Sequence, residues 1–266
     1  MRHIVLSGRR VAVHVEEPSS PAGSDVVLVH GAGFDHTIWR YQTRFLAGRG
    51  HRVLAPDLPG HGGSDGPPLE SIEEMADWLG GVMESFGCGP AILIGHSMGS
   101  YVALHRATSD PESVSALVLV GTTDRMRVHP ELLAASAERD QHAIDLMVGW
   151  MHTGTHRYGG HRSAGSWSAG SSRRTIERNL APLAADLAAC ERYDPTGRAA
   201  AVDDRTLIVS GSDDRMTTAS GAVRLDALIG DSEHVVLEGA GHIAVFERSE
   251  EVNAAIVAFL SRVRMP

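Results

Sequence analysis

The 266-residue chain has no lysine, only two cysteines and no long uninterrupted apolar stretch. Two cysteines, Cys88 and Cys190, are too few for a disulfide framework, so we expect two free thiols in a reducing compartment. No segment approaches the roughly 18 apolar residues that a membrane helix needs. Residues 1–18 alternate in polarity as two short strands do, and they lack the apolar stretch of a signal peptide. These absences predict a soluble, cytoplasmic protein with no membrane partner.

Positive charge is also scarce. All 24 basic residues are arginines, and 33 acidic residues bring the formal net charge to −9. Nucleic-acid binding depends on a basic face that neutralises phosphates, so this balance argues against a nucleic-acid partner. The hydrophobic content of 42% allows a large core. The length therefore fits one large domain, or a core with an insertion.

Short apolar runs that do not alternate in polarity recur along the chain. Runs of this kind are typical of strands buried on both faces of a parallel sheet. They lie at residues 26–30, 52–57, 91–95, 116–121, 206–211 and 234–239. Helical patterns such as 71–87, with a capping box at Ser71 and Glu74 and a stop at Gly87, and 250–263 lie between or after them. The alternation predicts an α/β fold with a mostly parallel central sheet and helices on both faces.

The alternation stops between Thr122 and Ala200. Helical patterns at 130–152 and 172–191, the second interrupted by Pro182, flank a stretch rich in glycine and serine. A long insertion between two strands is most simply a helical lid over one end of the sheet, here after the sixth strand. We therefore predict an α/β core of residues 1–122 and 201–266 and a lid of residues 123–200. The lid contains ten arginines and nine acidic residues, so it is nearly neutral.

The spelling G-x-S-x-G occurs twice, at residues 95–99 and 62–66. Ser97 follows a buried-strand run and precedes a helical pattern, the context that lifts a serine Oγ clear of the sheet edge. Glycines on either side suit so sharp a turn, and the helix start directs backbone N–H groups at developing negative charge. Ser64 lies between two loop segments. We therefore predict that Ser97 is a nucleophile and that Ser64 is a turn residue.

A serine nucleophile needs a base, usually a histidine, that a carboxylate orients. In open α/β sheets, functional groups gather at the carboxyl ends of the strands. His242 follows the run at 234–239, and Asp213 and Asp214 follow the run at 206–211. The order serine, aspartate, histidine is the one expected for this arrangement.

Five segments together resemble the α/β-hydrolase-fold serine hydrolases over nearly the whole chain. They are "HGAGFDHTIW" at 30–39, "DLPGHGGSD" at 57–65, "GHSMG" at 95–99, "GSDDR" at 211–215 and "GAGH" at 239–242. The resemblance implies that Ser97 is the nucleophile, His242 the base and Asp214 the acid. Asp213 is the adjacent alternative for the acid. Asp124 is a second one, because some relatives take the acid from the preceding strand.

The resemblance also implies an oxyanion hole made by the backbone amides of Ala32 and Met98, with Gly33 as a donor that either replaces or assists Ala32. His30 is expected to stabilise this loop by hydrogen bonding. We expect no cofactor and no metal. The pair His152 and His156 has the spacing of helical metal ligands, but a glycine lies between them and no acidic residue does.

Serine at this turn argues against haloalkane dehalogenases and epoxide hydrolases, which use aspartate. We predict hydrolysis of a small neutral or hydrophobic ester through an acyl-enzyme. Hydrolysis of a carbon–carbon bond in meta-cleavage-type diketones is the nearest alternative, lactonase and thioesterase activities follow, and a non-catalytic receptor is the least favoured. The substrate pocket is expected to include Phe34, Met147, Trp150, Met151 and Trp167. We expect a monomer or homodimer whose partner is a small-molecule substrate.

Overall fold

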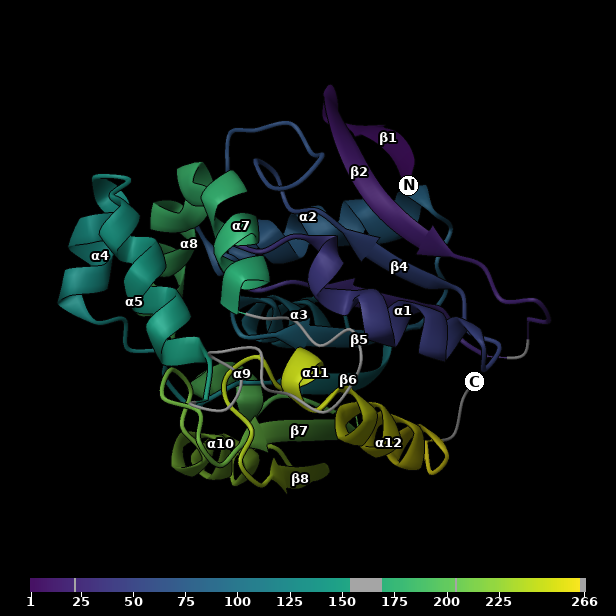
Figure 1. Ribbon diagram of the computed structural model, residues 1–266. Helices are drawn as coiled ribbons and strands as arrows, with labels where there is room; N and C mark the ends of the chain where they lie inside the picture. The colour runs from purple at the N-terminus through teal and green to yellow at the C-terminus, as the bar shows by residue number, and fades with distance from the viewer. Residues whose placement is uncertain (22, 154–168, 204, 264–266) are drawn as a thin grey trace.

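The central feature of the computed structural model is an eight-stranded sheet with the order β1-β2-β4-β3-β5-β6-β7-β8 (Figure 1). The structure describes residues 1–21, 23–153, 169–203 and 205–263. The strands are β1 (Arg2–Leu6), β2 (Arg9–Glu16), β3 (Val26–Val29), β4 (Val53–Pro56), β5 (Ala91–His96), β6 (Val114–Val120), β7 (Thr206–Gly211) and β8 (Ser232–Leu237). Strands β3 to β8 run parallel, whereas β2 pairs antiparallel with both β1 and β4.

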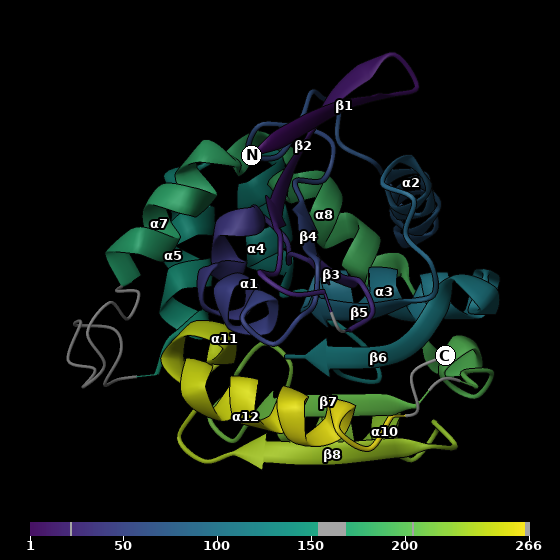
Figure 2. The ribbon, with the colours of Figure 1, turned by 90° about the vertical axis from the view of Figure 1, so that its right-hand side faces the viewer.

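Helices cover both faces of this sheet (Figure 2). Helices α1 (Arg40–Ala47) and α12 (Ser249–Leu260) pack together on one face, and α2 (Ile72–Ser85) and α3 (Met98–Ser109) pack together on the other. Shorter elements complete the core: η1 (His36–Trp39), η2 (Pro111–Ser113), α10 (Ala219–Asp226) and α11 (Ala244–Glu247). Every residue of β3, β5 and β7 is buried. The predicted α/β architecture is therefore confirmed.

The sequence predicts that strand β8 is buried on both faces, and the structure differs. Among the described strands it pairs with β7 alone, so it forms one edge of the sheet. None of its residues is fully buried, and Val236 is 47% exposed. The apolar run at 234–239 correctly predicted a strand, but its composition did not distinguish an edge strand from a central one.

The predicted cap of helix α2 is present in a modified form. The Ser71 hydroxyl accepts the Glu74 amide at 3.2 Å, as a capping box requires. The Glu74 carboxylate accepts the Glu70 amide at 2.9 Å, one residue before the expected partner. Gly87 follows the helix with φ +60°, a conformation that favours glycine.

Among the described residues between β6 and β7 there are five further helices, and four of them gather at one end of the sheet (Figure 1). They are α4 (Pro130–Ala137), α5 (Gln141–Met151), α7 (Ala169–Arg178), α8 (Leu180–Arg192) and α9 (Thr196–Ala199). The pattern at 130–152 is two helices, because Arg139 adopts φ 54° between them. The second break lies at Asn179 and not at Pro182, which occupies the first turn of α8, where no intrahelical N–H bond is lost. We refer to these helices as the insertion; its role as a lid stays a prediction.

Both cysteines are free thiols, as expected. Burial raises the pKa of the Cys88 thiol to about 12, so this side chain stays protonated and unreactive near neutral pH. Burial also raises the pKa of Cys190. Within the described residues, no helix combines the length and the apolar character needed to cross a bilayer.

Candidate active site

Ser97 forms the turn between β5 and α3. Its backbone has φ 52° and ψ −123°, an unfavourable conformation for a residue with a side chain. The Ser97 amide donates to the Val120 carbonyl at 2.9 Å, and its carbonyl accepts the Ser100 amide at 2.8 Å. The surrounding backbone therefore holds the turn in its strained form, while the Ser97 side chain faces a cavity.

The two glycines beside Ser97 allow close backbone packing. A Cβ atom at Gly95 would lie 2.2 Å from the Gly99 carbonyl oxygen, and one at Gly99 would lie 2.2 Å from the Val29 carbonyl oxygen. Real Cβ atoms do not approach backbone oxygens so closely. The requirement for glycine at both positions, inferred from the sequence, thus has a steric basis in the fold.

His242 and Asp214 meet beyond the ends of β8 and β7. The His242 Nδ1 atom lies 2.9 Å from Asp214 Oδ2, and both side chains are buried. The other carboxylate oxygen accepts the amides of Met216 at 2.8 Å and Thr217 at 2.9 Å. Burial opposes ionisation of Asp214, but His242 and the Thr217 bonds outweigh it and lower the pKa of this carboxyl. Asp214 is therefore an anion that His242 Nδ1–H can contact.

Sequence reasoning did not single out Thr217. Its hydroxyl donates to Asp214 Oδ2 at 2.7 Å and lies 3.1 Å from His242 Nδ1. Thr217 also faces the cavity. Only its position three residues after Asp214 signalled a role, and that position alone does not indicate where the hydroxyl points.

The two alternative candidates for the acid contact groups other than His242. Asp124 forms a two-point ion pair with Arg224, at 2.6 and 2.9 Å, and that guanidinium lowers the pKa of Asp124. Asp213 is exposed and accepts the hydroxyl of the adjacent Ser212. Neither carboxylate has a hydrogen bond to His242 among the described contacts.

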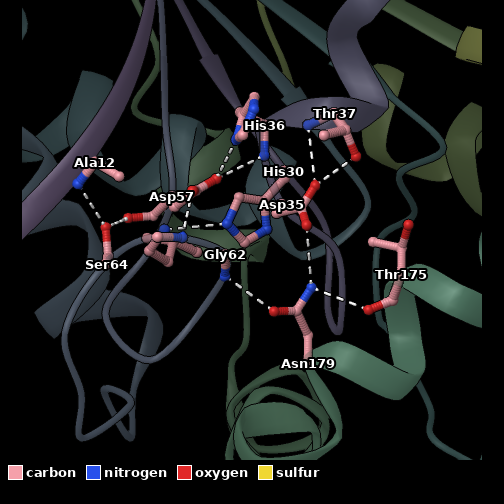
Figure 3. A network of polar contacts seen from close by, with 12 residues as sticks. Ala12, His30, Asp35, His36, Thr37, Asp57, Gly62, Ser64, Thr175 and Asn179 are labelled. Carbon is pink, nitrogen blue, oxygen red and sulfur yellow. Dashed lines mark hydrogen bonds and ion pairs between the residues drawn. The ribbon is translucent and has the colours of Figure 1, made fainter. Parts of the chain in front are cut away.

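Ser64 belongs to a structural network and not to the cavity (Figure 3). Its hydroxyl donates to the Asp57 carbonyl at 2.6 Å and accepts the Ala12 amide at 2.9 Å. Asp57 is fully buried and accepts bonds from His36 and from the Gly63 amide. These contacts fix the loop after β4.

Residues 30–34, which we call the oxyanion loop after the role predicted for it, lie against Ser97. A Cβ atom at Gly31 would lie 3.1 Å from Ser97 Cβ, so the loop approaches the serine closely. Ala32 lines the cavity with Ser97, whereas Met98 begins helix α3 and its side chain is buried outside the cavity lining. The Gly33 amide donates to Asp186 of α8 at 2.9 Å. The Gly33 N–H therefore already has a hydrogen-bond acceptor within the protein.

Two buried histidines, His30 in this loop and His96 beside it, are neutral. His30 Nε2 accepts the Leu58 amide at 3.1 Å, and its Nδ1 lies 2.9 Å from the Gly31 carbonyl. His96 Nε2 lies 2.9 Å from the His242 carbonyl. Burial lowers the pKa of His30 to about 4 and that of His96 to about 3. Both rings therefore hold backbone in place, as expected for His30.

The cavity that Ser97 and His242 share has a volume of about 540 Å³. Four of the five expected pocket residues line it: Phe34, Met147, Trp150 and Met151. Trp167 lies outside the described residues. Further lining residues that sequence reasoning missed include Met126, Val128, His129, Leu132, Leu187, Cys190, Arg215 and Met216. Met126, Val128 and His129 follow the carboxyl end of β6, so the rule that functional groups gather at the carboxyl ends of strands also applies to them.

His152 links the insertion to the loop that carries His242. Its ring lies 3.2 Å from the Glu247 carboxylate and 2.9 Å from the Ser172 hydroxyl. The His242 amide also donates to the Met151 carbonyl at 3.0 Å. His156 lies outside the described residues. Within the described part of the chain, no three His, Cys, Asp or Glu side chains are grouped as metal ligands.

Comparisons with known proteins support the α/β fold described above. The model of the alpha/beta hydrolase family matches residues 26–255. A 2-hydroxy-6-oxononadienedioate/2-hydroxy-6-oxononatrienedioate hydrolase from Burkholderia vietnamiensis is 28% identical over 98% of this chain and 94% of that protein. A thermophilic esterase from Thermogutta terrifontis is 28% identical, with a TM-score of 0.84 and full coverage of both chains.

An enol-lactonase from Burkholderia xenovorans has a TM-score of 0.88 at 21% identity, covering 98% of this chain and 100% of that one, and shares the fold. The chain spans very different shares of its curated relatives, from 12% of one to 99% of another.

Proposed function

We propose that this protein, which belongs to the alpha/beta hydrolase family, is a serine hydrolase that cleaves a small neutral or hydrophobic ester. The observation that carries the proposal is one cavity that brings together a strained serine and a histidine bonded to a buried carboxylate. The nucleophile is Ser97, the base is His242 and the acid is Asp214. The oxyanion donors are the amides of Ala32 and Met98.

In this mechanism, the bond to Asp214 keeps the proton of neutral His242 on Nδ1, which leaves Nε2 free to accept one. Ser97 Oγ attacks the ester carbonyl and its proton passes to Nε2. The tetrahedral oxyanion receives the two amide hydrogen bonds. His242 then gives the proton to the leaving alkoxide, and an acyl-enzyme forms. Water, activated by the same histidine, releases the acid and restores Ser97.

The volume and the lining of the cavity favour a substrate with an apolar acyl group. Its volume lies within the range of about 300–1,000 Å³ typical of small-molecule sites. Four methionines, Met126, Met147, Met151 and Met216, contribute to its walls. Methionine side chains are flexible and polarisable, so they adapt to ligands of different shape. The similar thermophilic esterase is consistent with ester hydrolysis.

Carbon–carbon bond hydrolysis is the second candidate. The relative from Burkholderia vietnamiensis is named as a hydrolase of acidic dienedioate compounds. Arg127 and Arg215 reach the cavity wall, and a guanidinium there favours a substrate carboxylate. Arg127 already lies 3.7 Å from Glu191, which makes Arg215 the better candidate for such a contact.

A substrate panel tests the proposal. We expect turnover of p-nitrophenyl esters graded from acetyl to octanoyl, with loss of turnover in Ser97→Ala. A vinylogous diketone that bears a carboxylate is assayed beside them. If the diketone is the better substrate by kcat/KM, carbon–carbon hydrolysis replaces the ester proposal. If wild type acts on neither class, or if Ser97→Ala retains full activity, the serine hydrolase proposal fails.

A further inference from the structure

We propose that Asp186, on α8 of the insertion, is a positioning residue that fixes the oxyanion loop and thereby the Ala32 amide. The inference rests on the proposed function, because it concerns the loop that would hold the oxyanion. Asp186 does not line the cavity, so it acts through the loop and has no contact with substrate.

The contact joins segments that lie far apart in the sequence. Asp186 is completely buried, and its Oδ2 atom accepts the Gly33 amide at 2.9 Å. Gly33 has φ +69°, and a Cβ atom there would lie 3.1 Å from Leu183 Cδ1 of the same helix. Helix α8 therefore lies directly on the oxyanion loop at the residue after Ala32.

A buried charge pair strengthens this contact. His61 Nε2 lies 2.9 Å from Asp186 Oδ2, and His61 Nδ1 lies 3.2 Å from the Pro59 carbonyl. Both partners are acceptors, so both ring nitrogens carry a proton and His61 is a cation. Burial opposes this charge, but Asp186 and the Pro59 carbonyl outweigh it and raise the pKa of His61. An ionised acceptor holds the Gly33 amide more firmly than a neutral one.

A second contact from the insertion holds the residue that follows the loop (Figure 3). Asn179 donates to the Asp35 carboxylate at 3.4 Å and accepts the Gly62 amide at 2.9 Å. The amide of Gly33 is thus fixed by Asp186, and the side chain of Asp35 is held by Asn179. On the other side of Ala32, Gly31 packs against Ser97. The direction of the Ala32 N–H therefore depends on where α8 lies.

Two substitutions of Asp186 grade the loss of this contact. Asp186→Asn keeps an oxygen acceptor but removes the charge, and Asp186→Ala removes both. We expect kcat on an activated ester to fall in that order, with a loss of about 10- to 100-fold in Asp186→Ala and KM within about twofold of wild type. Hydrogen–deuterium exchange of residues 30–34 should become faster in the same order.

The split between kcat and KM separates positioning from simple support of the cavity wall. Helix α8 also carries Leu187 and Cys190, which line the cavity. If Asp186 only anchors the helix, KM rises, kcat stays and exchange of the loop is unchanged, and the inference is overturned. Arg192→Gln is the matched control, since Arg192, at the C-terminal end of the same helix, bonds to the Glu70 carbonyl and to no residue of the loop among the described contacts. It should leave kcat and loop exchange at wild-type values.

The two proposals fail in different ways. A wild-type enzyme without esterase activity refutes the proposed function, and exchange of residues 30–34 in the Asp186 variants still decides whether α8 fixes the loop. If Asp186→Ala does not fold, the test uses Asp186→Asn, for which smaller changes in kcat and in loop exchange are expected. Unchanged kcat and unchanged exchange in a folded Asp186→Asn overturn the inference.

Discussion

At the scale of single residues, the Asp214 carboxylate is held by contacts at both of its oxygens. Its Oδ1 atom accepts two backbone amides, and its Oδ2 atom accepts the Thr217 hydroxyl and faces His242. These bonds leave little freedom for the carboxylate to rotate. The orientation of the imidazole therefore depends on Thr217 as well as on Asp214.

Loss of the Thr217 hydroxyl should weaken this orientation. We expect Thr217→Val, which keeps the side-chain shape, to lower kcat by about 10-fold, because one of the hydrogen bonds to the ionised carboxylate is worth roughly 1.5 kcal/mol. Thr217→Ser keeps the hydroxyl and should retain most of the activity. Steady-state kinetics on one activated ester compare the two variants, and equal rates would exclude a role for the hydroxyl.

Removal of the Asp214 charge should have a larger effect. In Asp214→Asn the amide cannot keep the imidazole in its tautomer or stabilise the imidazolium, and kcat should fall by about 10⁴. Asp213→Asn is the matched control, because Asp213 is the exposed neighbour. Near-normal turnover in Asp214→Asn, together with a large loss in Asp213→Asn, would reassign the acid.

At the scale of elements, the turn between β5 and α3 depends on close backbone packing. A Cβ atom at Gly99 would overlap the Val29 carbonyl of the neighbouring strand β3, and neither backbone can yield without moving an element. Gly197, in α9, has no atom within 4 Å of an added Cβ. Gly99 and Gly197 therefore form a matched pair for substitution by alanine, because the first position is crowded and the second is open.

Gly99→Ala should lower the free energy of unfolding by about 3 kcal/mol or more, at the upper end of the cost of overpacking. Gly197→Ala should raise it by up to about 1 kcal/mol, because alanine is the better helix former. Urea denaturation measures both values. A Gly99→Ala variant as stable as wild type would mean that the turn is looser than the structure indicates.

Much of the arrangement of elements could be predicted from the sequence. The apolar runs located the parallel strands, and the strand–turn–helix context predicted Ser97. The rule that functional groups gather at strand ends predicted His242 and the pair Asp213 and Asp214, from which the family resemblance selected Asp214. Neither the edge position of β8 nor the break at Arg139 could be predicted, because both depend on tertiary neighbours. Asp186 and His61 were missed for the same reason: their contact joins residues 125 positions apart, and only folding makes them partners.

At the scale of the whole molecule, buried histidines make stability depend on pH. Burial lowers the pKa of His30 to about 4 and of His96 to about 3, from 6.5 in the unfolded chain. Below pH 6.5 the unfolded chain binds protons that the folded chain does not, so acidification favours unfolding. His36 and His61 have raised pKa values. The stability that these two histidines add to the folded state is fully present below pH 6.5. It is lost as the pH rises through their raised pKa values.

We therefore expect the free energy of unfolding to fall as the pH decreases from 6.5 to 4.5, with a slope of up to about 1.4 kcal/mol per pH unit for each buried neutral histidine. Urea denaturation at three pH values measures the slope. His30→Gln should reduce it, and His3→Gln, at an exposed position, should not. A stability that is constant or rises on acidification would contradict the neutral state of His30 and His96.

The central claim is that Ser97 is the nucleophile, and covalent labelling tests it most directly. Wild-type protein is treated with a fluorophosphonate, and the modified residue is located by mass spectrometry of peptides. The account predicts one phosphonyl group, on Ser97, with no labelling of Ser97→Ala and unchanged labelling of Ser64→Ala wherever that variant folds. A label on another residue, equal labelling of Ser97→Ala, or no label on folded wild type would contradict it.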